Sequence, residues 1–192
     1  MKPASLVSAT LLVVACGPFA VPANAEAPMP CADLVTLDLP ATTMMSAEEV
    51  PAGPVPVGST APTCASPVAS PQLPAFCRVI GVVAPAITFE VWLPLEGWNG
   101  KFQAFGNHGF AGDLDYSDMG PELVKGYAIA STDTGHAGSD PLPWMQNEQQ
   151  IIDYGHRGVH EMTLKSKEVV RAFYGRPAKY SSSCRLARAI SG

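Results

Sequence analysis

A glycine-rich stretch at residues 101–112, which reads KFQAFGNHGFAG, constrains this chain more than any other feature. Its first five residues alternate polar and apolar side chains, a pattern that predicts a short strand. Gly106, Gly109 and Gly112 then allow left-handed backbone angles or a close approach to a ligand. The run EVWLPLEGWNG precedes the stretch and KGYAIASTDTGHAG follows it. Together these patterns indicate an α/β domain with a glycine loop at the end of a strand.

Two further runs before the loop predict an antiparallel pair of strands. Residues 78–84 are apolar and rich in valine, and residues 87–93 alternate between apolar and polar side chains. Beyond the loop, residues 127–132 predict another strand, and a short helix at residues 121–125 leads into it. The DTGH segment at residues 133–136 therefore lies at the carboxyl end of a strand, where open α/β sheets bind ligands.

The clearest helix signal covers residues 151–173. Apolar side chains recur there at helical spacing, and Gly175 with Pro177 supplies a stop. A strand is expected next at residues 178–181, and a long helix between two strands is the crossover that parallel strands need. We therefore expect one domain built on a mixed sheet with helices on both faces.

Residues 1–25 have the features of a secretory signal peptide. A short apolar run, too short to span a bilayer, ends before Ala23-Asn24-Ala25, which fits signal peptidase cleavage and predicts a mature chain from Glu26. An alternative is that Val13-Val14-Ala15-Cys16 is a lipoprotein box, which would make the product a lipid-anchored surface protein through Cys16. Either interpretation predicts export, to the periplasm or the medium.

The charge balance limits the classes of partner, and the cysteines indicate candidate disulfides. The chain has 12 basic and 17 acidic residues, so it offers no basic footprint for nucleic acid, whereas a small neutral or aromatic substrate fits this balance.

Four cysteines remain after leader cleavage, and in an oxidising compartment they are disulfide candidates: Cys31, Cys64, Cys77 and Cys184. Their spacings match no zinc pattern, and the residues alone leave their pairing open. We expect no membrane contact beyond the leader.

Several segments resemble the tannase and feruloyl esterase family of secreted α/β-hydrolases. These are CADLVTLDLPATTMMSAEEVPAG from residue 31, LPAFCRV from residue 73, and the glycine loop with its flanking strands. The resemblance implies a disulfide between Cys31 and Cys77, which would pin an N-terminal arm, residues 26–76 with only short strands, onto a catalytic domain that starts at residue 77. It also implies hydrolysis of feruloyl or galloyl esters through a serine acyl-enzyme intermediate.

This sequence departs from the family's nucleophile motif, Gly-Cys-Ser-x-Gly-Gly-Arg. Cys184 can be placed on the family's cysteine, but Arg185 and Leu186 follow it, where the tight elbow needs serine and small residues. We interpret the serines at residues 181–183 as loop residues and name no nucleophile. In the family the catalytic Asp and His, and a lid with a calcium site, come after the serine. Residues 77–192 are therefore expected to form an incomplete α/β-hydrolase, truncated before or within the elbow, without a cofactor and inactive in this form.

One catalytic contribution is expected from the glycine loop. In such hydrolases the loop after this strand supplies a backbone N–H to the oxyanion hole, and by resemblance we assign that N–H to Gly109. Family members usually carry glycine where this chain has His108. The alternative interpretation is that these glycines only turn the chain.

Weaker hypotheses concern metal binding by the remaining histidines and ligand stacking by three aromatic residues. His156 and His160 are four residues apart, but no third ligand is evident, so we interpret them as helix-face residues. His136 in the DTGH loop matches a family feature near the rim of the active site. Three aromatic residues are candidates for stacking on an aromatic acyl group or for the core: Trp92, Trp98 and Phe110.

The rival to an esterase fragment is a non-catalytic product, either a degenerate paralogue or a secreted binding module on the same scaffold. Reading the gene past the codon for Gly192 in all three frames separates the two. The fragment hypothesis predicts Gly-Cys-Ser-x-Gly-Gly followed by a later Asp and His. Unrelated downstream sequence would instead support the binding module.

Overall fold

The computed structural model describes residues 27–54 and 72–184. The expected signal peptide, the lipoprotein cysteine Cys16, Cys64, and Arg185 with the residues after it lie outside these ranges. Within the described ranges, no helix combines the length and apolar character needed to cross a membrane.

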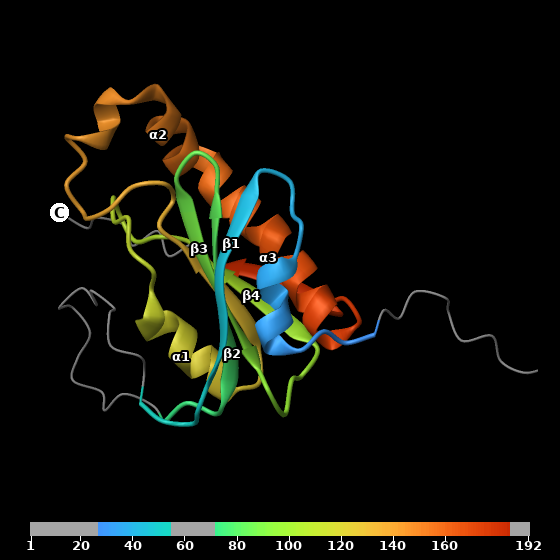
Figure 1. Ribbon diagram of the computed structural model, residues 1–192. Helices are drawn as coiled ribbons and strands as arrows, with labels where there is room; N and C mark the ends of the chain where they lie inside the picture. The colour runs from blue at the N-terminus through green and yellow to red at the C-terminus, as the bar shows by residue number, and fades with distance from the viewer. Residues whose placement is uncertain (1–26, 55–71, 185–192) are drawn as a thin grey trace, which may run out of the picture.

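A mixed sheet forms the centre of the described chain (Figure 1). Its strands are β1 (Thr42–Val50), β2 (Phe76–Val83), β3 (Ile87–Pro94), β4 (Lys101–Phe105), β5 (Ala128–Thr132) and β6 (Tyr180–Cys184), in the spatial order β1-β2-β3-β5-β4-β6. The strands from β1 to β3 pair antiparallel, as do β3 and β5, whereas β4 runs parallel to both β5 and β6. This arrangement confirms the predicted mixed sheet.

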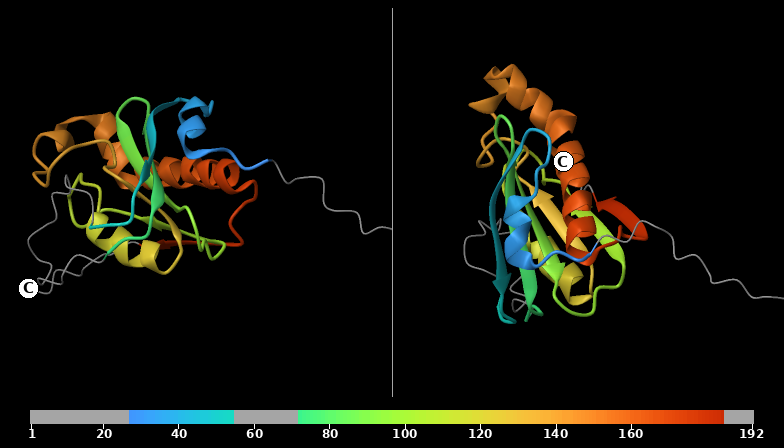
Figure 2. Two further views of the ribbon diagram at one scale, coloured as in Figure 1. Left: turned by 60° about the horizontal axis from the view of Figure 1, so that its bottom comes forward. Right: turned by 45° about the vertical axis from the view of Figure 1, so that its right-hand side comes forward.

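Helices cover both faces of the sheet, as expected. The α-helices are α1 (Tyr116–Val124), α2 (Glu148–Ile152) and α3 (Gly158–Tyr174). The 3₁₀ turns are η1 (Cys31–Thr36) and η2 (Trp144–Gln146), and η3 (Asp153–Arg157) is a π-helical turn. Figure 2 shows α1 and α3 on opposite sides of the strands. Along β5, Ala128 and Ala130 belong to the core beneath α3, whereas Ile129 belongs to the core beneath α1. Both faces of this strand are buried, which explains why Ala128, Ile129 and Ala130 follow one another without polar alternation.

The N-terminal arm differs from the prediction of only short strands. It contributes the nine-residue strand β1, which pairs along the whole of β2. The sequence pattern concealed this strand, because the register shifts between Met44 and Ser46 and such a bulge breaks the alternation of side chains. The disulfide implied by the family resemblance, Cys31–Cys77, is present and joins η1 to β2.

The two predicted helices begin earlier than expected, and the longer one is interrupted. Helix α1 starts at Tyr116, with Asp115 as the residue that caps it, so Pro121 lies inside the helix. The segment predicted as one helix over residues 151–173 starts in α2 and passes through η3, a π-helical turn, before α3. At the start of α3, a Cβ on Gly158 would lie 2.9 Å from the Thr134 Cα atom, so the helix meets the loop after β5 backbone to backbone.

A buried carboxylate connects β2, β3 and α1. The side chain of Glu90 on β3 is fully buried and accepts hydrogen bonds from Arg78 on β2 (Nε to Oε1, 2.6 Å), from the Tyr116 hydroxyl on α1 (2.7 Å) and from the Trp92 indole. The hydrogen bond to Glu90 raises the pKa of Arg78. Burial, followed by the negative charge of Glu90, raises the pKa of Tyr116. Both donors therefore keep their protons, and the carboxylate stays compensated.

We predict that Glu90→Gln lowers the free energy of unfolding by about 3 kcal/mol, because it leaves the Arg78 guanidinium without its buried counter-charge. Urea unfolding of the purified chain measures this loss. Glu48→Gln is the matched control, since Glu48 contacts the same guanidinium at 3.9 Å but its side chain is 61% exposed. Its loss should stay below about 1 kcal/mol, and equal losses in the two variants would contradict the importance of the buried bond.

Candidate functional site

The parallel strands end together at one edge of the sheet. Phe105, the last residue of β4, pairs with Ser131 near the end of β5 and with Cys184 at the end of β6. The glycine loop follows β4, and the DTGH loop follows β5. This is the edge at which open α/β sheets bind ligands, so the predicted position of both loops is confirmed.

Side chains from other elements hold the glycine loop. The His136 imidazole donates a hydrogen bond from Nε2 to the Phe110 carbonyl at 3.0 Å, and the Tyr154 hydroxyl donates one to the Gly109 carbonyl. The Ala111 N–H donates to the His108 carbonyl at 3.0 Å, which closes a turn. Because C=O and N–H point in opposite directions across a planar trans peptide, these bonds also set the directions of the Gly109 and Phe110 N–H groups.

Gly109 lies at the exposed tip of this turn. Its φ angle is 53°, in the left-handed region that favours glycine, and a Cβ there would meet no atom within 4 Å. Among the described residues its N–H makes no hydrogen bond. The oxyanion-hole role of this N–H stays a prediction.

Position 112 requires glycine because a neighbouring backbone leaves no room for a side chain. Its N–H donates to the Gly138 carbonyl at 2.9 Å, and a Cβ on Gly112 would lie 2.2 Å from the His136 carbonyl oxygen. The glycine loop and the DTGH loop therefore pack backbone against backbone. Asp133 anchors the second loop by accepting hydrogen bonds from the Thr88 and Gly135 N–H groups, and burial raises the pKa of its carboxyl.

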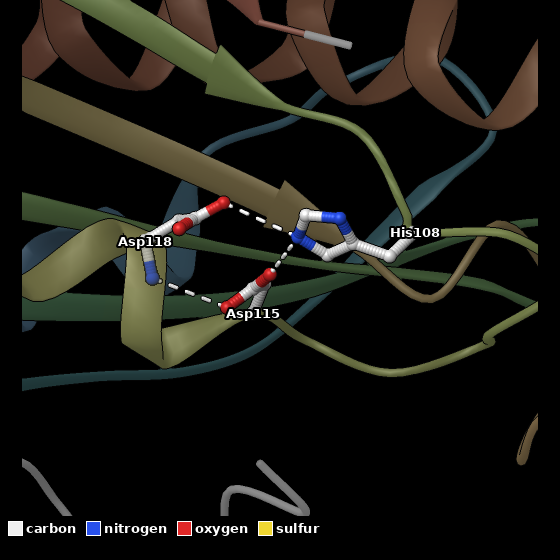
Figure 3. A group of neighbouring side chains, drawn as sticks. All are labelled: His108, Asp115 and Asp118. Carbon is white, nitrogen blue, oxygen red and sulfur yellow. Dashed lines mark hydrogen bonds and ion pairs between the residues drawn. The ribbon is translucent and has the colours of Figure 1, made fainter. Parts of the chain in front are cut away.

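His108 is bound to the N-terminus of α1. Its Nε2 atom lies 2.5 Å from Oδ2 of Asp115 and 3.2 Å from Oδ2 of Asp118 (Figure 3). Asp115 also caps α1, since its Oδ1 atom accepts from the Asp118 N–H. Burial, then the negative charge of Asp115, raises the pKa of Asp118, whereas His108 lowers it. Sequence reasoning missed both aspartates, and recognising the Asp115 cap as the start of α1 was the signal that could have found them.

Four rings gather beside the glycine loop: those of Phe110, His136, Trp144 and Tyr154. The Trp144 ring is central, with centroids 4.7 Å from His136, 4.6 Å from Tyr154 and 6.1 Å from Phe110. Trp144 is buried, whereas Phe110 remains 46% exposed. The cluster therefore presents the Phe110 ring to solvent at the carboxyl edge of the sheet.

The other two aromatic candidates lie away from this edge. Trp92 is fully buried in the core between Phe76 and the α1 helix. Trp98 stacks on Tyr174 at 3.7 Å and donates its indole N–H to the Lys101 carbonyl, at the opposite end of β4 from the glycine loop. Of the three, only Phe110 is placed to contact a ligand at the loop.

An open groove of about 640 Å³ runs beside the strand ends. Gly106, Ser183, His156 and His160 line it, the histidines from η3 and α3. Both histidines are exposed, and among the described residues neither belongs to a group of three metal-ligating side chains. Ser181, which lies at the end of the strand expected at residues 178–181, belongs to β6, and so do Ser182 and Ser183, which were predicted to be loop residues. Within the described ranges no serine hydroxyl is hydrogen-bonded to a histidine.

The mixed sheet, with the glycine loop and the DTGH loop at its carboxyl edge, defines an α/β-hydrolase-like fold. The family model of tannase and feruloyl esterase matches residues 72–183, and the chain belongs to this family. An uncharacterized esterase of Xanthomonas campestris pv. campestris is 41% identical over 164 residues, which are 82% of this chain and 27% of the relative. A probable feruloyl esterase B-2 of Aspergillus flavus is 34% identical over 62% of this chain and 23% of its own length.

Solved structures agree with this assignment. A crystal structure of feruloyl esterase B from Aspergillus oryzae has a TM-score of 0.69 at 25% identity, over 81% of this chain and 33% of that one. A second esterase from Aspergillus oryzae has a TM-score of 0.69 at 28% identity. The chain thus spans about a quarter of the length of these sequence relatives and about a third of these structures.

The two loop glycines allow a matched comparison. Gly112→Ala should lower the free energy of unfolding by about 3 kcal/mol, because the new methyl group forces two backbones apart. Gly109→Ala should cost only about 1 kcal/mol, since it adds left-handed strain without a clash. Urea unfolding monitored by tryptophan fluorescence measures both values. A Gly112→Ala variant as stable as Gly109→Ala would show that the two loops do not pack as described.

Proposed function

We propose that this chain forms the N-terminal part of an exported serine ester hydrolase that acts on feruloyl or galloyl esters. The glycine loop after β4 carries the proposal: it lies beside the end of β6, where the family places its nucleophile, and side chains from other elements hold it. Relatives named as feruloyl esterases support the phenolic substrate. The short cleavage motif Ala23-Asn24-Ala25 and the Cys31–Cys77 disulfide support export.

In this proposal the Gly109 N–H stabilises the oxyanion. When a serine attacks the ester carbonyl, the carbonyl oxygen becomes negatively charged, and backbone N–H groups at hydrogen-bonding distance lower the barrier. The turn closed by Ala111 and the bond from Tyr154 to the Gly109 carbonyl hold the loop before substrate arrives. Little reorganisation of the loop is then needed during the reaction. The second N–H would come from the residue after the nucleophile.

The exposed ring of Phe110 favours a substrate with an aromatic acyl group. It follows Gly109 directly, and a feruloyl or galloyl ring bound with its carbonyl at the Gly109 N–H could stack on it. Such ring contacts contribute about 0.5–1.5 kcal/mol beyond the burial of area. The substrate would be a small molecule, with no contribution from nucleic acid.

We further propose that the chain is inactive by itself. Arg185 occupies the position where the family's motif carries serine, and Ala187 and Arg188 stand where it carries Gly-Gly. This same observation favours the second candidate function, a secreted binding module or degenerate paralogue that retains the loop without catalysis. A chimera distinguishes the two candidates.

The chimera joins residues 1–184 of this chain to the part of the Xanthomonas campestris relative that follows the equivalent cysteine. If the scaffold is competent, the chimera should hydrolyse feruloyl or galloyl methyl ester with a rate that a serine-directed inhibitor abolishes, while the 192-residue chain stays at background. The intact relative is the positive control, and its downstream part alone is the negative control. A folded but inactive chimera beside an active relative would favour the binding module. Inhibitor-sensitive turnover by the original chain would contradict its inactivity.

A further inference from the structure

Three metal-ligating atoms converge beside the glycine loop. Nε2 of His108 and one carboxylate oxygen each from Asp115 and Asp118 all lie within 4.8 Å of one another (Figure 3). In the described part of the chain this is the only group of three such side chains. Two separate elements supply them, since His108 comes from the loop after β4 and both aspartates come from the start of α1.

Among the described residues no lysine or arginine balances the charges of this cluster. Neither aspartate has a lysine or arginine partner among the described residues, so a single imidazole faces two carboxylates. Even a protonated His108 has only one N–H at Nε2, which cannot donate a strong hydrogen bond to both oxygens at once. The two aspartates and a protonated His108 still sum to a net charge of −1. A divalent cation would be bound by all three atoms and would neutralise both carboxylates.

We propose that His108, Asp115 and Asp118 form a binding site for a first-row divalent metal ion, with zinc the best fit. Zinc takes imidazole and carboxylate ligands at about 2.0–2.2 Å, and tetrahedral ligands at that distance lie about 3.3 Å apart. The His108–Asp118 distance of 3.2 Å already matches this spacing. The His108–Asp115 distance of 2.5 Å must open by less than about 1 Å.

The surroundings fit such a site. The two carboxylate oxygens of Asp115 have separate tasks: Oδ1 accepts from Ser117 Oγ and the Asp118 N–H, which orients the side chain and leaves Oδ2 facing His108. Asp115 is 7% exposed, whereas His108 and Asp118 are 34% and 31% exposed, so the ion has one buried ligand and an open path from solvent. Three protein ligands leave a fourth position for water. Calcium and magnesium, which prefer oxygen ligands alone, fit this donor set less well.

Calorimetric titration of the chelator-treated, full-length chain with zinc chloride tests the proposal, with free thiols blocked by iodoacetamide to exclude binding by cysteine. We expect saturable binding of one zinc ion per chain, together with a higher melting temperature of the chain in zinc. His108→Asn and Asp118→Asn should each weaken binding at least tenfold and abolish the shift in melting temperature. Asp115→Asn should do the same, and it retains the helix cap because asparagine caps as well as aspartate.

The controls separate this site from adventitious binding. Asp38→Asn removes an exposed carboxylate elsewhere, and His160→Asn disrupts the exposed pair His156 and His160, so neither should change the affinity. Circular dichroism without zinc confirms that each variant is folded, and Asp118→Asn alone suffices if Asp115→Asn unfolds. An absence of saturable binding, or binding that persists in His108→Asn and Asp118→Asn, overturns the proposal. The test does not depend on ester hydrolysis, so it stands whether or not the proposed function holds.

Discussion

The buried carboxylate of Glu90 fixes the start of helix α1, which faces His108. Its hydrogen bonds join Arg78 on β2, Trp92 on β3 and Tyr116 on α1, and so attach the first turn of α1 to the sheet. A charge buried to this extent is tolerated only with full compensation, and the arginine and two neutral donors provide it. Because Tyr116 follows Asp115 directly, the same bonds place the helix start that faces His108.

The carboxyl edge of the sheet is assembled by close contacts between backbones. Gly112 lies against the His136 carbonyl, and Gly158 lies against Thr134, so the glycine loop, the DTGH loop and the start of α3 pack without intervening side chains. The π-helical turn η3 lies next to this contact and brings Tyr154 to the Gly109 carbonyl. Such turns frequently occur at functional sites. The glycine loop is thereby held from several directions.

Predictions that rested on a few consecutive residues were accurate, whereas elements without such a local pattern were missed. Strand β4 was predicted with its observed bounds, because alternation and a glycine stop are read within a few residues. Strand β1 was missed, because its bulge between Met44 and Ser46 disrupts that alternation and its partner β2 is distant in sequence. The η3 turn was also missed, because a π turn occurs as a single turn within a helix and the apolar pattern of α3 begins directly after it.

The sequence by itself determined the mixed sheet, the glycine loop at a strand end and the resemblance that the family match confirms. These depend on local periodicity and on short motifs. Only the tertiary structure decided which side chains meet at the loop: Asp115 and Asp118 at His108, and the rings of Trp144 and Tyr154 beside Phe110. The Asp115 cap could have marked the start of α1 in the sequence. The contacts themselves depend on how α1 and the η3 turn pack across the sheet, and no spacing along the chain encodes that packing.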